Sequence, residues 1–207
     1  MTTEASSKAW TPQSVPFELT TGASDAGWCD FSVRLGNAQW DCQASYIEDH
    51  PLHSLIHSAI GIHSELSRPN DNPSTWDSLA ADEGGGIFIR AKREGGMVRI
   101  KVFHYPGGEP WPSPEKQPQP PAGEAVIGFQ DYALAIYRDA GRAITRQGIM
   151  GFAKGWDWSW CDGEPFSEPV PIPQFLRLAG IVRNLPVDKP MTLDEEIEIL
   201  RSLANGL

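Results

Sequence analysis

Three histidines near residue 50 have the spacing that comes closest to a metal site: His50, His53 and His57. On a helix over residues 51–66 their rings would lie on one side, close enough to share a metal ion. The H-E-x-x-H spacing of zinc hydrolases is missing from this group. Solvated histidines opposite an apolar stripe explain the pattern as well. We therefore predict no native metal and no other cofactor, and keep a metal-dependent hydrolase as an alternative.

A second group combines indole rings with carboxylates. Its members are Trp156, Asp157, Trp158, Trp160, Asp162 and Glu164. In an extended strand the alternate spacing would put all three indoles on one side. Exposed, they would form a surface for a protein or a carbohydrate, because indoles give large contact areas; buried, they would cover one end of the core. We predict that these six residues bind a partner.

Residues 90–101 hold five cations and only one acid. A hairpin turning at Gly95-Gly96 would gather four of them on one face, with Phe88 opposite Phe103: Arg90, Lys92, Arg99 and Lys101. Like charges on facing strands destabilise a sheet, so acids should lie nearby, and Asp30 and Asp41 are the candidates. The alternative is a phosphate-binding face, or an aromatic platform for single-stranded nucleic acid.

Composition excludes several classes of protein. A net charge of −10 over 207 residues disfavours nucleic-acid binding, which needs cations to neutralise phosphates. No apolar run reaches the roughly 18 residues of a membrane helix, and the amino terminus lacks the pattern of a signal peptide. The three cysteines lack metal-type spacing, which fits reduced thiols in the cytoplasm. No nucleophile elbow or phosphate-binding glycine loop is present, so we predict that the protein is not an enzyme.

Two hairpins and four helices should position these groups. Strands 28–35 and 39–47 flank Gly36-Asn37, which suits a type II′ turn and pairs Phe31 with Cys42 and Val33 with Trp40. Strands 87–93 and 98–105 form the second hairpin, with one apolar face each. Helices are expected over 51–66, 129–147, 171–182 and 192–204 from apolar residues at helical spacing. Residues 67–86 are expected to be a loop.

These elements predict an α+β fold, with a single antiparallel sheet built from hairpins and helices packed on one face. Residues 1–15 are expected to be a mobile tail and 16–184 one domain, in which 106–123 form a proline-rich loop. A carboxy-terminal extension with an amphipathic helix follows over 185–207.

Several short motifs occur in the same order along residues 27–182. They are Trp28-Cys29-Asp30-Phe31, Ala44-Ser45-Tyr46-Ile47, Phe129 with Tyr132, Gly148-Ile149-Met150-Gly151-Phe152, and Pro171 with Pro173 before Leu176. In these motifs the chain resembles a family of small bacterial α+β proteins of mostly unassigned function. Some members of that family look like immunity proteins encoded beside polymorphic or contact-dependent toxins.

The resemblance implies a cytoplasmic, non-catalytic binding protein that neutralises a cognate toxin. The acidic net charge favours a basic toxin as the partner, because opposite charge speeds encounter. A binding module for nucleic acid or carbohydrate is the other alternative. We predict no nucleic acid and no membrane among its partners.

Overall fold

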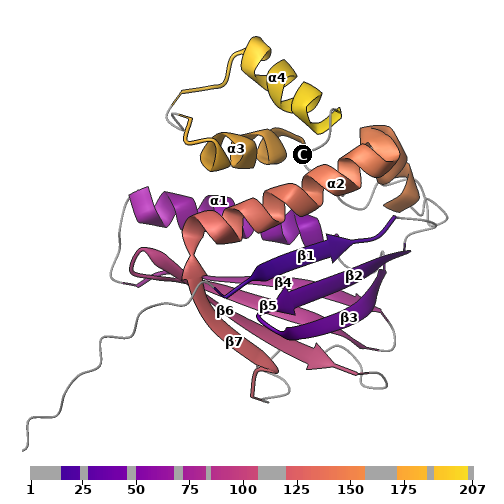
Figure 1. Ribbon diagram of the computed structural model, residues 1–207, viewed down its shortest axis with the longest axis vertical. Coiled ribbons are helices and arrows are strands. Elements are labelled where there is room, and N and C mark those ends of the chain that lie inside the picture. Colours follow the sequence, from indigo (N-terminus) through magenta and orange to yellow (C-terminus); the bar gives the residue numbers. More distant parts are fainter. Residues whose placement is uncertain are drawn as a thin grey trace, which may run out of the picture.

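The computed structural model describes residues 15–23, 28–45, 50–67, 72–82, 85–106, 120–156, 172–185 and 189–204. In order along these residues, the strands are β1 (Phe17–Thr21), β2 (Trp28–Leu35), β3 (Ala38–Ser45), β4 (Thr75–Asp82), β5 (Gly85–Glu94), β6 (Met97–Tyr105) and β7 (Gly123–Gly128). The helices are α1 (Pro51–Ser67), α2 (Phe129–Trp156), α3 (Ile172–Val182) and α4 (Leu193–Ala204). Figure 1 shows the four helices gathered on one side of the strands.

The first hairpin has the predicted register. Phe31 pairs with Cys42 and Val33 with Trp40, around a turn in which Gly36 has a φ of 64°. Phe31 is buried as expected, whereas Trp40 is only partly buried and packs against the edge of the core. Strand β1, which the sequence analysis did not identify, pairs with the far side of β2.

The second hairpin, β5–β6, also has the predicted register, with Phe88 opposite Phe103. It lies in the middle of a four-stranded sheet of order β4-β5-β6-β7. The expectation of a loop over residues 67–86 is wrong, because β4 pairs with β5 along its whole length and β5 already begins at Gly85.

The strands form two antiparallel sheets, so the prediction of a single sheet is wrong while the α+β class is confirmed. Strand β3 lies against β4 and β5 of the second sheet but belongs to the first sheet. At one point the Cys42 thiol donates a hydrogen bond to the carbonyl of Ala80 on β4, over 3.3 Å. At another the indole of Trp40 covers Gly123 on β7, where a Cβ atom would lie 2.4 Å from the ring.

The helices are stacked in layers above the sheets (Figure 1). Helix α1 packs on β4 and β5, α2 packs on β1 and β7, and α3 rests on both helices. Helix α4 forms the outermost layer. A capping box begins it: the Glu195 carboxylate accepts the Thr192 N–H over 2.7 Å. Helix α2 is interrupted at Gly148, where the prediction ends it, because φ of 70° with ψ of 161° is accessible almost only to glycine.

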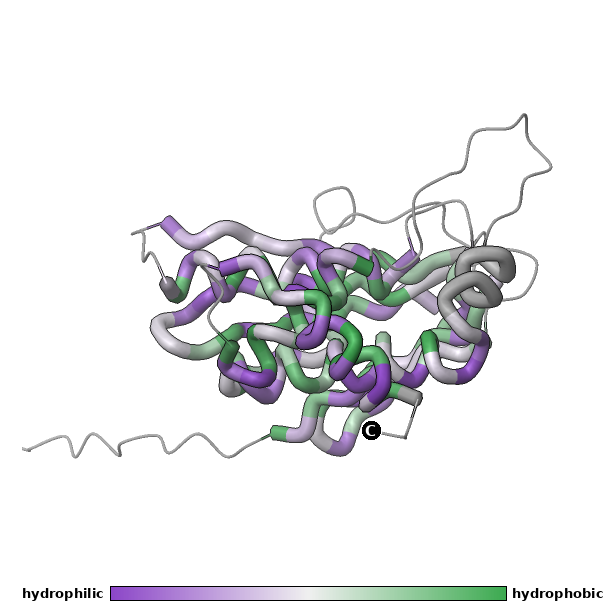
Figure 2. The backbone as a smooth tube through the Cα atoms, turned by 90° about the horizontal axis from the view of Figure 1, so that it is seen from above, coloured by the Kyte–Doolittle hydropathy of each residue, from purple (hydrophilic) through white to green (hydrophobic). Residues whose placement is uncertain are grey.

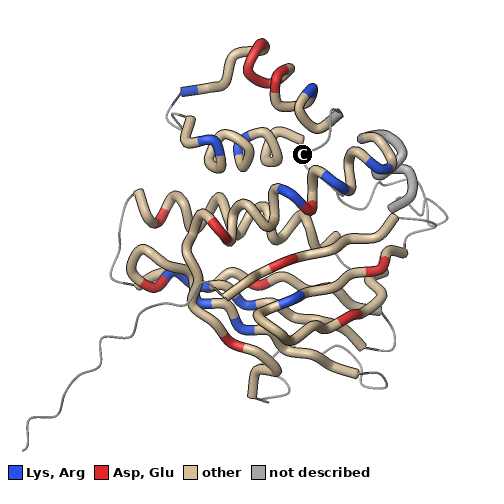
Figure 3. The backbone as a smooth tube through the Cα atoms, viewed as in Figure 1, with Lys and Arg blue, Asp and Glu red and all other residues tan. Residues whose placement is uncertain are grey.

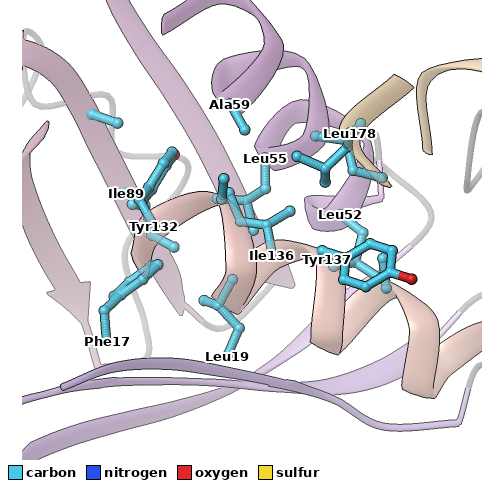
Figure 4. Packing of buried hydrophobic residues seen from close by; sticks show 14 of the residues in the cluster. Phe17, Leu19, Leu52, Leu55, Ala59, Ile89, Tyr132, Ile136, Tyr137 and Leu178 are labelled. Atoms are coloured by element: carbon cyan, nitrogen blue, oxygen red, sulfur yellow. The ribbon is translucent and has the colours of Figure 1, made fainter. Parts of the chain in front are cut away.

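One hydrophobic core joins the helices to both sheets. Figure 4 shows Phe17 and Leu19 of β1 pointing toward Tyr132 and Ile136 of α2, with side chains of α1 above them. The rings of Phe17 and Tyr132 are stacked with centroids 5.6 Å apart. Hydrophobic stretches of several elements meet in the middle of the molecule (Figure 2). In the described part of the chain, no helix is long and apolar enough to cross a membrane.

We expect the Gly61→Ala substitution to destabilise the protein by about 1–3 kcal/mol through overpacking. A Cβ atom on Gly61 in α1 would lie 2.0 Å from the indole of Trp76 on β4, so the helix could no longer approach the strand. Urea unfolding measures the loss of free energy. In a Trp76→Ala background the same substitution should cost much less, and an equal cost in both backgrounds would contradict this account.

Candidate functional site

The predicted partner surface lies almost wholly outside the described residues. Of its six members, only Trp156 belongs to a described element, as the last backbone residue of α2. Asp157, Trp158, Trp160, Asp162 and Glu164 lie in the segment 157–171, which connects α2 to α3. The assignment of these residues to partner binding therefore stays a prediction. The predicted tail over 1–15, apart from Val15, and most of the proline-rich loop, 107–119, also lie outside the described residues.

The histidine group is divided by burial. His50 is fully buried, so the expectation that it faces water is wrong. It precedes α1 and caps it: its Nδ1 accepts the backbone N–H of Leu52 over 3.1 Å. Burial, with a smaller contribution from neighbouring His53, lowers the pKa of His50 to about 3, so the ring is neutral at neutral pH.

His53 and His57 lie together on the half-buried side of α1, with ring centroids 4.7 Å apart. Among the described residues, no group of three or more His, Cys, Asp or Glu side chains is arranged to hold a metal ion. The geometry therefore brings together two imidazoles, His53 and His57, and no third metal-ligating group in the described part of the chain.

The structure brings a cysteine and a histidine together that the sequence analysis did not pair. The thiol of Cys29 on β2 lies 3.7 Å from Nε2 of His50. Because Nδ1 accepts a backbone N–H, the neutral ring carries its proton on Nε2, which then points at the sulfur. Such a ring cannot take the thiol proton, and burial raises the pKa of Cys29 to about 12. This pair holds the start of α1 against β2 and is not arranged as a catalytic dyad.

The cations on β5 and β6 are paired with acidic side chains, as expected, but these acids are not Asp30 and Asp41. Asp77 on neighbouring β4 accepts two hydrogen bonds from Arg90, each 2.7 Å long. Arg99 binds Glu94, at 2.7 Å, and Glu124. The two first-hairpin acids belong to the other sheet, so they cannot lie across a strand pair from these cations.

A buried carboxylate that the sequence analysis missed joins α2 to β1. Asp139 accepts hydrogen bonds from the backbone N–H of Thr21, at 3.0 Å, and from its hydroxyl, at 2.7 Å. Arg142 lies 3.5 Å from the same carboxylate. Burial raises the pKa of Asp139, while the hydrogen bonds from Thr21 oppose that shift. The signal was present, because Asp139 occupies the apolar stripe of α2 between Ile136 and Ala143.

Charge is unevenly divided along the chain. The described residues hold 14 acids and 14 lysines and arginines, so the net charge of −10 resides in the segments outside them. Within the described part, arginines recur along α2 and acids cluster in the first turns of α4 (Figure 3). The acidic character used to predict a basic partner thus belongs to the connecting and terminal segments.

Comparison with known proteins identifies no relative: no family model, no curated protein and no solved structure matches this chain. The molecule is therefore defined by its own architecture, an α+β fold of a three-stranded and a four-stranded antiparallel sheet with four helices in the described residues.

Proposed function

We propose that this chain is a non-catalytic binding protein of the immunity type, which neutralises a basic toxin by binding it through acidic, tryptophan-containing segments. The observation that carries the proposal is the division of charge. The described residues are electrically balanced, with 14 acids against 14 lysines and arginines, and the whole excess of negative charge lies in the segments outside them. An acidic surface of this kind would attract a basic effector and speed its encounter.

The segment 157–171 is the strongest candidate for contact with the partner. It contains four acids and no lysine or arginine, together with Trp158 and Trp160. Tryptophans supply much of the free energy of tight interfaces, and neighbouring carboxylates would pair with the cations of a basic partner.

The titratable groups inside the fold support a binding role because they already have structural tasks. His50 caps a helix and points Nε2 at Cys29, and Asp139 holds β1 against α2. The alternative of a nucleic-acid platform loses support, since Arg90, Arg99 and Lys101 are engaged by acids and phosphates would have to compete for them.

Co-expression with the neighbouring reading frame tests the proposal. We expect the chain to protect cells from that gene product and to co-purify with it. Replacing Trp158 and Trp160 by Ala should weaken the complex at least tenfold, about 1.4 kcal/mol, while the protein stays folded. Trp111→Ala is the matched control, because this indole lies in another segment outside the described residues.

The two parts of the proposal fail separately. Absence of both protection and co-purification would overturn the immunity function. Protection that survives the double substitution but is lost with Trp111→Ala would move the interface to residues 107–119 and overturn only the assignment of the surface.

A further inference from the structure

Strand β1 is the outer strand of the first sheet, and its hydrogen-bonding pattern shows which groups face outward. Gly36 donates its N–H to the carbonyl of Pro16, and Gly22 donates to that of Asp30. Even-numbered residues of β1 therefore bond to β2, and the N–H and C=O groups of Phe17, Leu19 and Thr21 point away from the sheet.

Side chains of α2 take the place of a neighbouring strand at one end of this edge. Asp139 accepts the N–H of Thr21, Arg146 donates to the carbonyl of Thr21 over 3.0 Å, and Arg142 donates to the carbonyl of Leu19 over 2.8 Å. The other end of the edge has no such cover. In the part of the chain that the structure describes, no hydrogen bond is made by the outward N–H and C=O of Phe17 or by the N–H of Leu19.

A groove runs along this open end. It has a volume of about 410 Å³ and lies between residues 15–20 and one side of α2, where Leu134, Ala135 and Arg138 line it. The groove thus combines unpaired backbone groups, an apolar wall and guanidinium groups. An extended peptide satisfies all three at once, because its backbone pairs with the edge and alternate side chains reach the wall.

The charges of the groove favour an acidic peptide. Arg138 and Arg142 line it from α2, and Arg142 is half exposed. Of the two lining acids, Glu18 forms an ion pair with Arg34, and Asp131 lies in the first turn of α2, where the helix dipole favours a carboxylate. Buried Asp139 offsets part of the Arg142 charge, which leaves Arg138 as the principal cation for a ligand.

We propose that this groove binds an extended, carboxylate-bearing segment of a partner protein, which adds a fourth strand to the β1–β2–β3 sheet beside β1. Its inward side chains lie on the same side as Phe17 and Leu19, facing α2. An acidic residue there meets Arg138 and Arg142, and an apolar residue meets Leu134 and Ala135. None of the residues that line this groove belongs to the segment 157–171 of the proposed function.

Selection from random nine-residue peptides displayed on phage tests the site. We expect the wild-type protein to enrich peptides in which carboxylates and apolar residues alternate. Chemically synthesised winners should bind the Arg138→Glu/Arg142→Glu variant at least tenfold more weakly. Arg177→Glu/Arg201→Glu, which reverses two exposed arginines on α3 and α4 away from the groove, is the charge-matched control and should leave binding unchanged.

Methylation of the peptide backbone distinguishes strand addition from simple charge attraction. N-methylation should abolish binding at the peptide residue whose amide donates to the open carbonyl of Phe17, and have little effect at the two residues beside it, whose amides point away from β1. Equal binding to the double arginine variant, failure to enrich any peptide, or equal tolerance of methylation at all residues would each overturn the proposal. Circular dichroism of each variant confirms that its fold is intact.

Discussion

Acidification from pH 6.5 to pH 4 should cost the folded protein about 3 kcal/mol through His50 alone. Burial lowers the pKa of this imidazole from 6.5 to about 3. Between these two values the imidazole of His50 binds a proton in the unfolded chain but not in the folded protein, so the free energy of unfolding falls as the pH falls. The loss begins near pH 6.5 and ends near pH 3, where the folded protein also becomes protonated.

His50→Asn is the matched control for this effect. An asparagine at the first cap position of α1 can accept the Leu52 N–H with its side-chain oxygen, but it does not titrate. Urea unfolding at pH 7, 6, 5 and 4 should show a steeper loss of stability for the wild type than for this variant. Because all other titrating groups are common to both proteins, parallel pH profiles would show that His50 is not responsible.

Hairpin register was predictable because it depends on a few neighbouring residues. Gly36 and Gly95 supply the positive φ that their two-residue turns require, at 64° and 60°. Once the turn is fixed, alternation assigns every side chain of both strands to a face, as the pairs Phe31–Cys42 and Phe88–Phe103 confirm.

Strand β4, at the edge of the four-stranded sheet, and the division of the strands into two sheets could not be predicted from turn residues and alternation. Strand β4 buries small or polar groups, such as Ser78 and Ala80, so its inward positions do not form an apolar alternation. The packing of β3 against the second sheet rests on Trp40 lying on Gly123, a contact between residues far apart in sequence. By contrast, β1 does alternate, with Phe17, Leu19 and Thr21 buried, so the sequence does carry a signal for this strand.

Helical spacing misled the prediction for the histidines because it extended the helix by one residue. His50 is the cap of α1 and lies outside its regular geometry, so its side chain does not follow the direction of His53 and His57. Only three-dimensional packing places its ring beside Cys29. The positions of Cys29 in the hairpin and of His50 before the helix do not indicate this contact in the sequence.

Replacement of Asp139 by Ala should destabilise the protein by about 3 kcal/mol, because it leaves the buried N–H of Thr21 without an acceptor and Arg142 without its carboxylate. Strand β1 should loosen first, since in the described part of the chain Asp139 is one of three α2 side chains that hydrogen-bond to it and the one that accepts two bonds from Thr21. Amide hydrogen exchange should therefore accelerate over residues 17–21 more than in β5 or β6. Uniform acceleration in all strands would contradict a local role for Asp139.

A double-mutant cycle and a pH series isolate the carboxylate itself. Thr21→Val keeps the backbone N–H but removes the hydroxyl, so its cost in free energy of unfolding should shrink once Asp139 is Ala.

Because burial raises the pKa of Asp139 above its ordinary 3.8, the folded protein holds this proton more tightly than the unfolded chain. Its contribution to stability is therefore greatest at low pH and declines as the pH rises through the folded pKa. This decline with rising pH is opposite to the trend that His50 imposes. The Asp139→Asn variant does not titrate at this position and should lack the decline. An identical pH profile for the wild type and Asp139→Asn would show that the carboxyl titrates normally.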